Sequence, residues 1–181
     1  YHSVYALQSP FFLERDAMFY VELFRQLETD KVRYMVVGGL AMNLLGGPRS
    51  TMDVDLVRAL DAENLRHFLE AARHLRLSPV APVQLDEFLD PEKRRLWRKQ
   101  KNMLAFALRS PQLEAPTVDI LIDPPVDIEA ALKRVEYRMV QDLRLPVMSV
   151  RDMITLKEQA GRQQDIADIE HLHRLAETTR K

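Results

Sequence analysis

Polar and charged side chains occupy every second position from residue 49 to residue 55. The four residues are Arg49, Thr51, Asp53 and Asp55. Because successive side chains of a β-strand point to opposite faces, a strand here would present all four on one face. Two carboxylates that face the same way repel each other unless a cation joins them. Mg²⁺ suits this position, because it takes oxygen ligands and is commonly held by one or two carboxylates together with substrate phosphates.

A third carboxylate, Asp119, interrupts the apolar run Val118–Ile122. A lone Asp in a strand of buried type costs free energy unless it is paired or binds a metal ion. If this strand lies beside the first one, three carboxylates converge. Such a trio can hold two Mg²⁺ ions about 3.5–4 Å apart, with Mn²⁺ as an alternative, which stabilise the attacking and leaving oxygens of phosphoryl transfer. The expected metal ligands are Asp53, Asp55 and Asp119.

The chain contains five glycines, and four of them form the pairs Gly38–Gly39 and Gly46–Gly47. The first pair follows an apolar run and precedes residues of helical character. Without Cβ atoms the backbone there can come close to a ligand, and the N–H groups at the start of a helix favour anions such as phosphate. The second pair precedes Pro48 and indicates a turn.

Hydrophobic periodicity predicts the elements that must position these residues. The predicted strands are 34–37, 51–57, 103–108, 117–122 and an edge strand at 135–140. The predicted helices are 14–28, 40–45, 61–75, 91–101, 127–134, one that is capped at Ser149 or Asp152, and 164–176. Met52, Val54 and Leu56 are expected to face the core. This order indicates an α+β (α/β) fold, with a mixed central sheet flanked by helices.

We expect one compact domain in three parts: an N-terminal arm and helix (1–30), a core (31–145) and a C-terminal helical segment packed on that core (146–181). The length of 181 residues suits one domain. Apolar residues (46%) and charged residues (29%) are near globular averages. The composition excludes a disordered or collagen-like chain, and no apolar run is long enough to span a membrane.

The absence of cysteine excludes disulfides and a thiolate nucleophile. The first residues lack the basic start and apolar run of a secretory signal. Both observations favour a cytoplasmic location. The net charge of −1 argues against a uniformly basic surface for nucleic acid.

The paired glycines, the alternating pattern that ends at Asp55 and the later Asp119 resemble the nucleotidyltransferase superfamily related to DNA polymerase β. Within it, the chain resembles small bacterial proteins of the AbiEii toxin type, and residues 145–172 are similar to the helical segment of those proteins. The resemblance implies the nucleotidyltransferase fold. It also implies the transfer of a nucleoside monophosphate from a nucleoside triphosphate to an acceptor hydroxyl, with release of pyrophosphate.

The resemblance implies a role for each matched residue. Asp53 and Asp55 would bind both metal ions, while Asp119 would bind the catalytic ion and help to activate the acceptor. The residues expected beside the triphosphate are Gly38, Gly39, Arg49, Thr51, Lys157 and Arg162. Gln164 stands where such proteins often have a basic residue, so no phosphate contact is implied for this turn.

The acceptor is left open among an RNA such as a tRNA end, a protein hydroxyl and a small molecule such as an aminoglycoside. The resemblance also raises a toxin–antitoxin role, with a cognate antitoxin as partner. The alternative function is a catalytically silent module that binds a nucleotide or RNA on the same fold. An intact carboxylate trio distinguishes the two, because a pure binder does not need it.

Other charged residues have simpler interpretations. The basic segment Lys93–Lys101 could bind RNA phosphates, with Trp97 stacking on a base. The favoured interpretation is a solvated helix face, with Leu96 and Trp97 turned to the core. Lys157 is interpreted either as an inward cation or as a surface lysine with a buried stem. Arg162, Asp165 and Asp168 are expected to form surface ion pairs.

Overall fold

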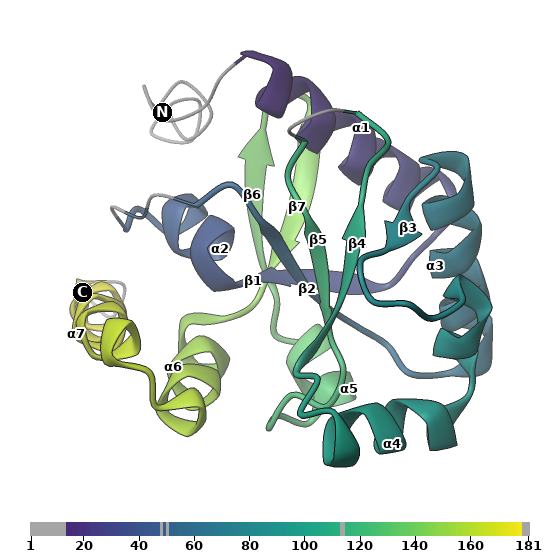
Figure 1. Ribbon diagram of the computed structural model, residues 1–181. Coiled ribbons are helices and arrows are strands. Elements are labelled where there is room, and N and C mark those ends of the chain that lie inside the picture. The colour runs from purple at the N-terminus through teal and green to yellow at the C-terminus, as the bar shows by residue number, and fades with distance from the viewer. Residues whose placement is uncertain (1–13, 48, 50, 113–114, 179–181) are drawn as a thin grey trace.

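A computed structural model describes residues 14–47, 49, 51–112 and 115–178 (Figure 1). The predicted arm at 1–13 lies outside the described residues. The helices are α1 (Glu14–Thr29), α2 (Gly38–Leu44), α3 (Ala62–His74), α4 (Pro91–Gln100), α5 (Ile128–Leu132), α6 (Val150–Ala160) and α7 (Gln163–Thr178), with a 3₁₀ turn η2 (Leu85–Leu89). The strands are β1 (Tyr34–Val37), β2 (Val54–Arg58), β3 (Ser78–Pro79), β4 (Ala105–Arg109), β5 (Val118–Leu121), β6 (Glu136–Val140) and β7 (Leu143–Val147).

The strands form one sheet in the order β3-β4-β5-β2-β1-β7-β6. β2 pairs with β5, and β1 with β7, in parallel, while the other neighbours are antiparallel. The sheet is therefore mixed, and β6 lies at its edge; both features confirm the predictions. The fold is α+β, as expected.

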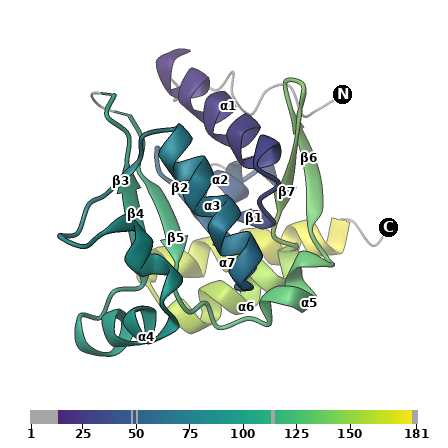
Figure 2. The same ribbon diagram turned by 90° about the vertical axis from the view of Figure 1, so that its right-hand side faces the viewer.

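Apolar side chains are buried on both faces of the central strands. Val54, Leu56 and Ile120 project to one face, and Val37 and Val57 project to the other; all are at most 1% exposed. In Figure 2, α1 and α3 lie in front of the sheet, whereas α6 and α7 lie behind it. On the face that carries Val37 and Val57, Asp55 and Asp119 interrupt the apolar side chains of β2 and β5.

Two helix starts follow from capping. The Asp61 side chain accepts a hydrogen bond from the backbone N–H of Asn64, which fixes the start of α3. The Ser149 side chain accepts one from the N–H of Asp152, so Ser149 is the cap of α6 rather than Asp152. None of the helices in the described part of the chain is long and apolar enough to cross a membrane.

Several features of the fold differ from the predictions. α2 begins at Gly38 rather than at residue 40, and β2 begins at Val54 rather than at residue 51. Met52 is 47% exposed instead of facing the core. β7 was not predicted, because Pro146 argues against a central strand; its ladder with β1 is confined to Val147. The expected domain boundary at 145/146 falls inside β7.

Arg58, at the end of β2, is a buried cation without a carboxylate partner in the described residues. It is 0% exposed, and its guanidinium lies 4.6 Å from the ring centre of Phe88. Nη1 donates to the Leu121 carbonyl (3.2 Å), but Nε and Nη2 have no hydrogen-bond partner among the described residues. Burial, with a smaller contribution from Arg94, lowers the pKa of Arg58 to about 9.

Replacing this cation by an apolar side chain of similar length is expected to preserve or raise stability. A buried charge that lacks its partners destabilises the fold, so Arg58→Met should raise the free energy of unfolding by about 0–3 kcal/mol. Arg58→Ala should instead lower it by about 2–4 kcal/mol, because it leaves a cavity. Urea unfolding measures both variants. A loss with methionine as large as the loss with alanine would contradict this account.

Candidate active site

A pocket of about 640 Å³ lies between the sheet, the end of α4 and the C-terminal helices. It contains the three expected carboxylates and the expected phosphate-binding residues. The predicted site residues on its wall are Gly38, Gly39, Arg49, Thr51, Asp53, Asp55, Asp119, Lys157 and Arg162. The sequence therefore predicted residues that line this pocket. The expectation that one strand presents Arg49, Thr51, Asp53 and Asp55 on a single face was wrong, because β2 begins at Val54. Arg49, Thr51 and Asp53 precede the strand.

Strand pairing brings two of the carboxylates together. Asp55 and Asp119 are directly opposite each other on the parallel strands β2 and β5. On the other side of β2, Asp55 pairs with Val37, the last residue of β1. Adjacent strands are about 4.8 Å apart, so the end of β1 and both carboxylates form one short row across the sheet. The expected neighbourhood of the two strands is confirmed.

Asp53 joins the row from the loop before β2. The Thr117 hydroxyl donates to Asp53 Oδ1 (2.9 Å) and lies 3.4 Å from Asp119 Oδ1. The hydroxyl of Tyr20, on α1, donates to the Met52 carbonyl (2.7 Å). One contact thus fixes the Asp53 side chain and the other fixes the backbone beside it, so the loop does not need strand pairing to hold its position.

The carboxylates oppose one another's ionisation. Burial raises the pKa of Asp55 to about 6, and the charges of Asp119 and Asp53 add to this effect; Arg162 and the backbone N–H of Gly39 offset part of it. Burial and Asp53 also raise the pKa of Asp119, against a hydrogen bond from Thr117. The site therefore concentrates negative charge that the surrounding protein does not neutralise.

Two glycines allow the backbone to approach this row. Gly38 has a φ of +66°, and a Cβ there would overlap the Asp55 carboxylate. A Cβ at Gly39 would lie 2.7 Å from the Thr51 Cβ, which is closer than real contacts allow. The glycine pair was expected to let the backbone come close to a ligand. In the structure, the side chains of Asp55 and Thr51 already lie so close to this turn that only glycine fits there.

A divalent cation fits the chemistry of the trio. Its oxygens are of the type Mg²⁺ prefers, and their mutual repulsion would be relieved by a cation. Among the described residues, no group of three or more His, Asp or Glu side chains is placed to hold an ion by itself. Mg²⁺ usually completes its coordination with water and substrate phosphates, so a fully protein-made cage is not required.

Behind the pocket wall, α6 and α7 share a buried ion-pair network. Lys157 is 5% exposed, and its Nζ lies 2.7 Å from Asp168 and 3.4 Å from Asp165. These two carboxylates are 4% and 1% exposed. The interpretation of Lys157 as an inward cation is therefore confirmed. Asp165 and Asp168 form ion pairs, as expected, but these pairs are buried, and the expected surface location was wrong. The side chain of Arg162 is 62% exposed, and its Nε donates to Asp165 (3.0 Å).

The missed aspartates left a signal in the sequence. Asp165, Asp168 and Leu172 lie at positions i, i+3 and i+7, which share one helix face, and all three are buried. Ile166, on another face, is 61% exposed. Burial alone would raise the pKa of Asp165, but hydrogen bonds and charge from Arg162 and the charge of Lys157 lower it.

Arg49 connects the loop before β2 with α7. Its backbone N–H donates to the Asn43 side chain (2.8 Å), its Nη2 donates to Gln164 (3.4 Å), and its Nε lies 3.8 Å from Asp168. Gln164 thus supports Arg49, which itself lines the pocket. Gln164 is neutral and therefore cannot bind phosphate as a cation would, but it accepts a hydrogen bond from Arg49 and so helps to position that side chain.

The favoured interpretation of the basic segment Lys93–Lys101, a solvated helix face with Leu96 and Trp97 turned to the core, is met in part. Trp97 is 5% exposed and stacks on Phe106 at 5.4 Å, so it packs in the core, as favoured, and does not present its ring to a base. Leu96 is 39% exposed, contrary to expectation. Arg98, however, lies on the wall of the carboxylate pocket. Asp123, which follows β5, is exposed and lies on the same wall.

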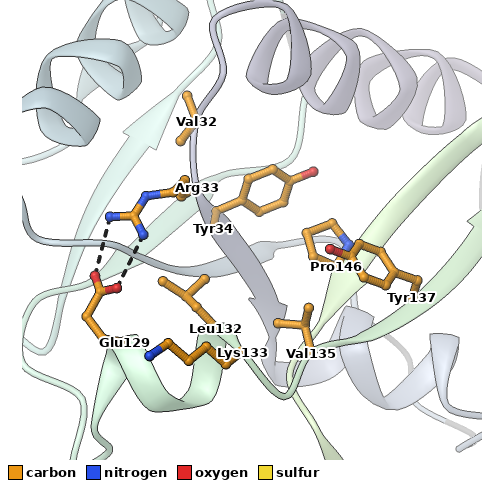
Figure 3. Close-up of a pocket in the computed structure, with 9 residues that line it drawn as sticks. All are labelled: Val32, Arg33, Tyr34, Glu129, Leu132, Lys133, Val135, Tyr137 and Pro146. Atoms are coloured by element: carbon orange, nitrogen blue, oxygen red, sulfur yellow. Dashed lines mark hydrogen bonds and ion pairs between the residues drawn. The ribbon is translucent and has the colours of Figure 1, made fainter.

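A second hollow of about 350 Å³ lies elsewhere, beside the start of β1, α5 and β6 (Figure 3). Val32, Leu132, Val135 and Pro146 contribute much of its lining. Its carboxylate, Glu129, is bound by Arg33. This hollow therefore lacks a set of converging unpaired carboxylates like that of the first pocket.

Comparisons with known proteins agree with this geometry. The family described as "Nucleotidyl transferase AbiEii toxin, Type IV TA system" matches residues 22–181, and the chain belongs to this family. The comparison with curated proteins finds no significant match. The expected resemblance is therefore confirmed at the level of the family.

Two solved structures share the fold. A nucleotidyltransferase-like antigenic protein from Paracoccidioides brasiliensis is 20% identical, with a TM-score of 0.54 over 87% of this chain and 75% of that one. The lincomycin-bound lincosamide antibiotic adenylyltransferase LnuA is 15% identical, with a TM-score of 0.56 over 90% of this chain and 98% of that one. At these identities the likeness establishes the nucleotidyltransferase fold.

Removing one charge from the row should stabilise the metal-free protein. Because the folded-state pKa of Asp55 is about 6, against 3.8 ordinarily, the ionised carboxylate destabilises the fold above that pH. Asp55→Asn should raise the free energy of unfolding near neutral pH by about 1–3 kcal/mol. The gain should fade as the pH falls from 6 toward 3.8.

Urea unfolding in the presence of a chelator measures this effect, with the exposed Asp123→Asn as the matched control. A gain that does not decline in acid would contradict charge repulsion as its cause. Added Mg²⁺ should raise the melting temperature of the wild type more than that of Asp55→Asn.

Breaking the buried network should have the opposite sign. Lys157→Met leaves Asp165 and Asp168 buried without their shared cation, and it should lower the free energy of unfolding by about 3–5 kcal/mol. Adding Asp168→Asn should recover part of that loss, because one uncompensated charge disappears. Chemical unfolding is the measurement, and the exposed neighbour Glu158→Gln is the control. An unchanged midpoint in Lys157→Met would show that the network contributes nothing to stability.

Proposed function

We propose that this protein transfers a nucleoside monophosphate from a nucleoside triphosphate to an acceptor hydroxyl, in a Mg²⁺-dependent reaction. The observation that carries the proposal is the row of Asp53, Asp55 and Asp119 beside a glycine turn, in one pocket. The membership of the AbiEii nucleotidyltransferase family supports the same reaction class. A silent binding module would not require uncompensated carboxylates that destabilise its own fold.

Asp53, Asp55 and Asp119 would hold two Mg²⁺ ions, with Mn²⁺ as a substitute. When bound, such ions neutralise phosphate charge and favour attack by a hydroxyl. The chain's own contribution is to aim three oxygen-bearing side chains at one place. Asp53 and Asp55 come from one strand and its leading loop, while Asp119 comes from the next strand, on the side toward β4.

The remaining residues position the triphosphate. The backbone at Gly38 and Gly39 would face the β- and γ-phosphates, with Thr51 packed beneath the turn. Arg49 and Arg162, both on the pocket wall, would supply positive charge. We assign Lys157 to positioning, because Asp165 and Asp168 already bind its ammonium group.

The reaction is an in-line displacement. The acceptor oxygen forms a bond to the α-phosphorus while the bond from that phosphorus to the bridging oxygen breaks, and pyrophosphate leaves with the electron pair. Asp119 would help to remove the hydroxyl proton. Most of the barrier reduction would come from orientation and from preorganised charge in the site.

We also propose that the protein acts in the cytoplasm as the toxin half of a toxin–antitoxin pair. The description of its family as a toxin of a type IV system supports this role. The partner would be a cognate antitoxin.

Loss of a carboxylate should abolish transfer without unfolding the protein. Asp53→Asn and Asp119→Asn should each lower the rate of label transfer from α-³²P-labelled nucleoside triphosphates by at least about a hundredfold. Incubation with Mg²⁺ and either total RNA or lysate measures the reaction, and Glu22→Gln, at an exposed position of α1 outside the pocket, is the control. Growth arrest on expression should be lost in parallel. Transfer unchanged by Asp53→Asn, or absent with every divalent metal, would overturn the proposal.

A further inference from the structure

The two edges of the sheet differ in whether a further strand could pair with them. At one edge, β3 has two residues and includes Pro79, which has no backbone N–H to donate. At the other edge, β6 has five residues and no proline, and no strand in the described part of the chain pairs with its outer side (Figure 2). Proteins commonly shorten or cover such an edge, because it offers unpaired backbone groups to another chain. β6 is therefore the edge that can accept a strand.

The hairpin with β7 determines which backbone groups of β6 are free. Its turn has two residues, so Val140 and Leu143 form the closing, hydrogen-bonded pair. Hydrogen-bonded and non-bonded pairs alternate from there, which makes Tyr137 and Pro146 a non-bonded pair. Pro146 has no N–H to donate, which agrees with this assignment. The N–H and C=O groups of Tyr137 and Met139 therefore point away from β7, toward the free edge.

The sequence of this edge is complementary to itself. Val135, Glu136, Tyr137, Arg138 and Met139 read apolar, acidic, aromatic, basic and apolar. If two copies pair antiparallel about Tyr137, Glu136 of each copy lies opposite Arg138 of the other, and Val135 lies opposite Met139. A centre one residue to either side would instead set Arg138 or Glu136 against its own copy. Opposite charges across two strands are favourable and like charges are unfavourable, so the pattern selects the register about Tyr137.

We propose that two copies of this chain associate through β6, antiparallel and centred on Tyr137, and so join their sheets into one. Tyr137 of each copy then donates its free N–H to the Tyr137 carbonyl of the other. Within one chain this carbonyl accepts only from the neighbouring Arg138 side chain (3.2 Å), which also binds Glu136 (2.7 Å). The side chains of Glu136 and Arg138 are 35% and 32% exposed, so each can exchange this contact for one with the second copy.

Exposed apolar side chains lie along the same edge. Tyr137 and Met139 are 49% and 46% exposed, and they share a face because they are two residues apart. Val135 and Tyr137 also line the hollow shown in Figure 3, together with Leu132. The proposed register places Met139 of the second copy opposite Val135, at the wall of this hollow. Two-fold symmetry repeats the contact, so apolar surface on both copies is removed from water.

Charge reversal tests the partner and the register together. Glu136→Arg sets two cations opposite each other in both charged pairs, and Arg138→Glu sets two carboxylates opposite each other. Each variant should raise the Kd of self-association, expected on the order of 10 μM for so short a ladder, at least about tenfold. Sedimentation velocity of the full chain over a concentration series measures this Kd.

An equimolar mixture of the two variants should restore association, because both charged pairs between unlike chains are then of opposite sign. Neither variant regains the ion pair within its own strand, so this rescue separates association from a merely structural role of that pair. The double variant Glu136→Arg/Arg138→Glu should associate like the wild type.

A cysteine cross-link tests the centre of the register. The chain has no cysteine of its own, and the Cα atoms of a hydrogen-bonded antiparallel pair are about 5.5 Å apart, within the reach of a disulfide. Tyr137→Cys should therefore form a covalent dimer under mild oxidation. Met139→Cys, on the same face, is the matched control, because its two copies would lie four residues apart along the strands, or about 14 Å. Non-reducing gel electrophoresis separates the two outcomes.

Circular dichroism spectra of all variants should match that of the wild type. A wild-type chain that stays monomeric at about 100 μM, ten times the expected Kd, would overturn the inference. So would a mixture that does not associate, or equal cross-linking of the two cysteine variants. A strand of another protein bound to β6, without self-association, would overturn it as well. The carboxylate pocket contains no residue of β6, so the result does not depend on the proposed transfer reaction.

Discussion

Electrostatic repulsion among three carboxylates is the constraint on which the rest of the site depends. Asp55 and Asp119 are opposite each other because β2 and β5 pair in parallel at that register. A shift of β2 by one residue would turn Asp55 to the opposite face of the sheet, away from Asp119. The buried residues Val54, Leu56 and Ile120 fix the register, so the hydrophobic core holds together charges that would otherwise separate.

The described part of the chain contains two acidic clusters that we discuss together. One is neutralised by cations within the fold and has a structural role, whereas the other is not neutralised and forms the proposed active site. Asp165 and Asp168 surround Lys157, with Arg162 and Arg49 on their outer side. This cluster is neutralised internally and joins α6 to α7. The row of Asp53, Asp55 and Asp119 has no comparable cation, and burial, together with the charges of Asp119 and Asp53, raises the pKa of Asp55. A group that lacks its partner within the fold is where an external cation would bind most strongly.

The trio could be predicted from the sequence because Asp residues interrupt the apolar residues of two separate strands. An Asp in a buried strand costs free energy unless it is paired or binds a metal ion. The sequence also predicted most helices and strands, since their periodicity is strong. It did not predict where β2 begins. The loop that carries Thr51 and Asp53 is held by Tyr20 and by packing under Gly39, and these contacts join residues distant in the chain. The burial of Asp165 and Asp168 was missed for a similar reason. Their spacing with Leu172 places them on one helix face, but it does not reveal that the partner buried against them is the charged Lys157.

The position of α4 shows how one helix can serve both the core and the site. Trp97 anchors it by stacking on Phe106, and an ion pair from Lys93 to Glu87 ties its first half to η2. These contacts fix the direction in which the helix ends, and the end is next to β4 and the carboxylate row. Because the cations of the first half have partners there, the field of the segment is concentrated at its last turn. A near-neutral chain can in this way present local positive charge beside its pocket without being uniformly basic.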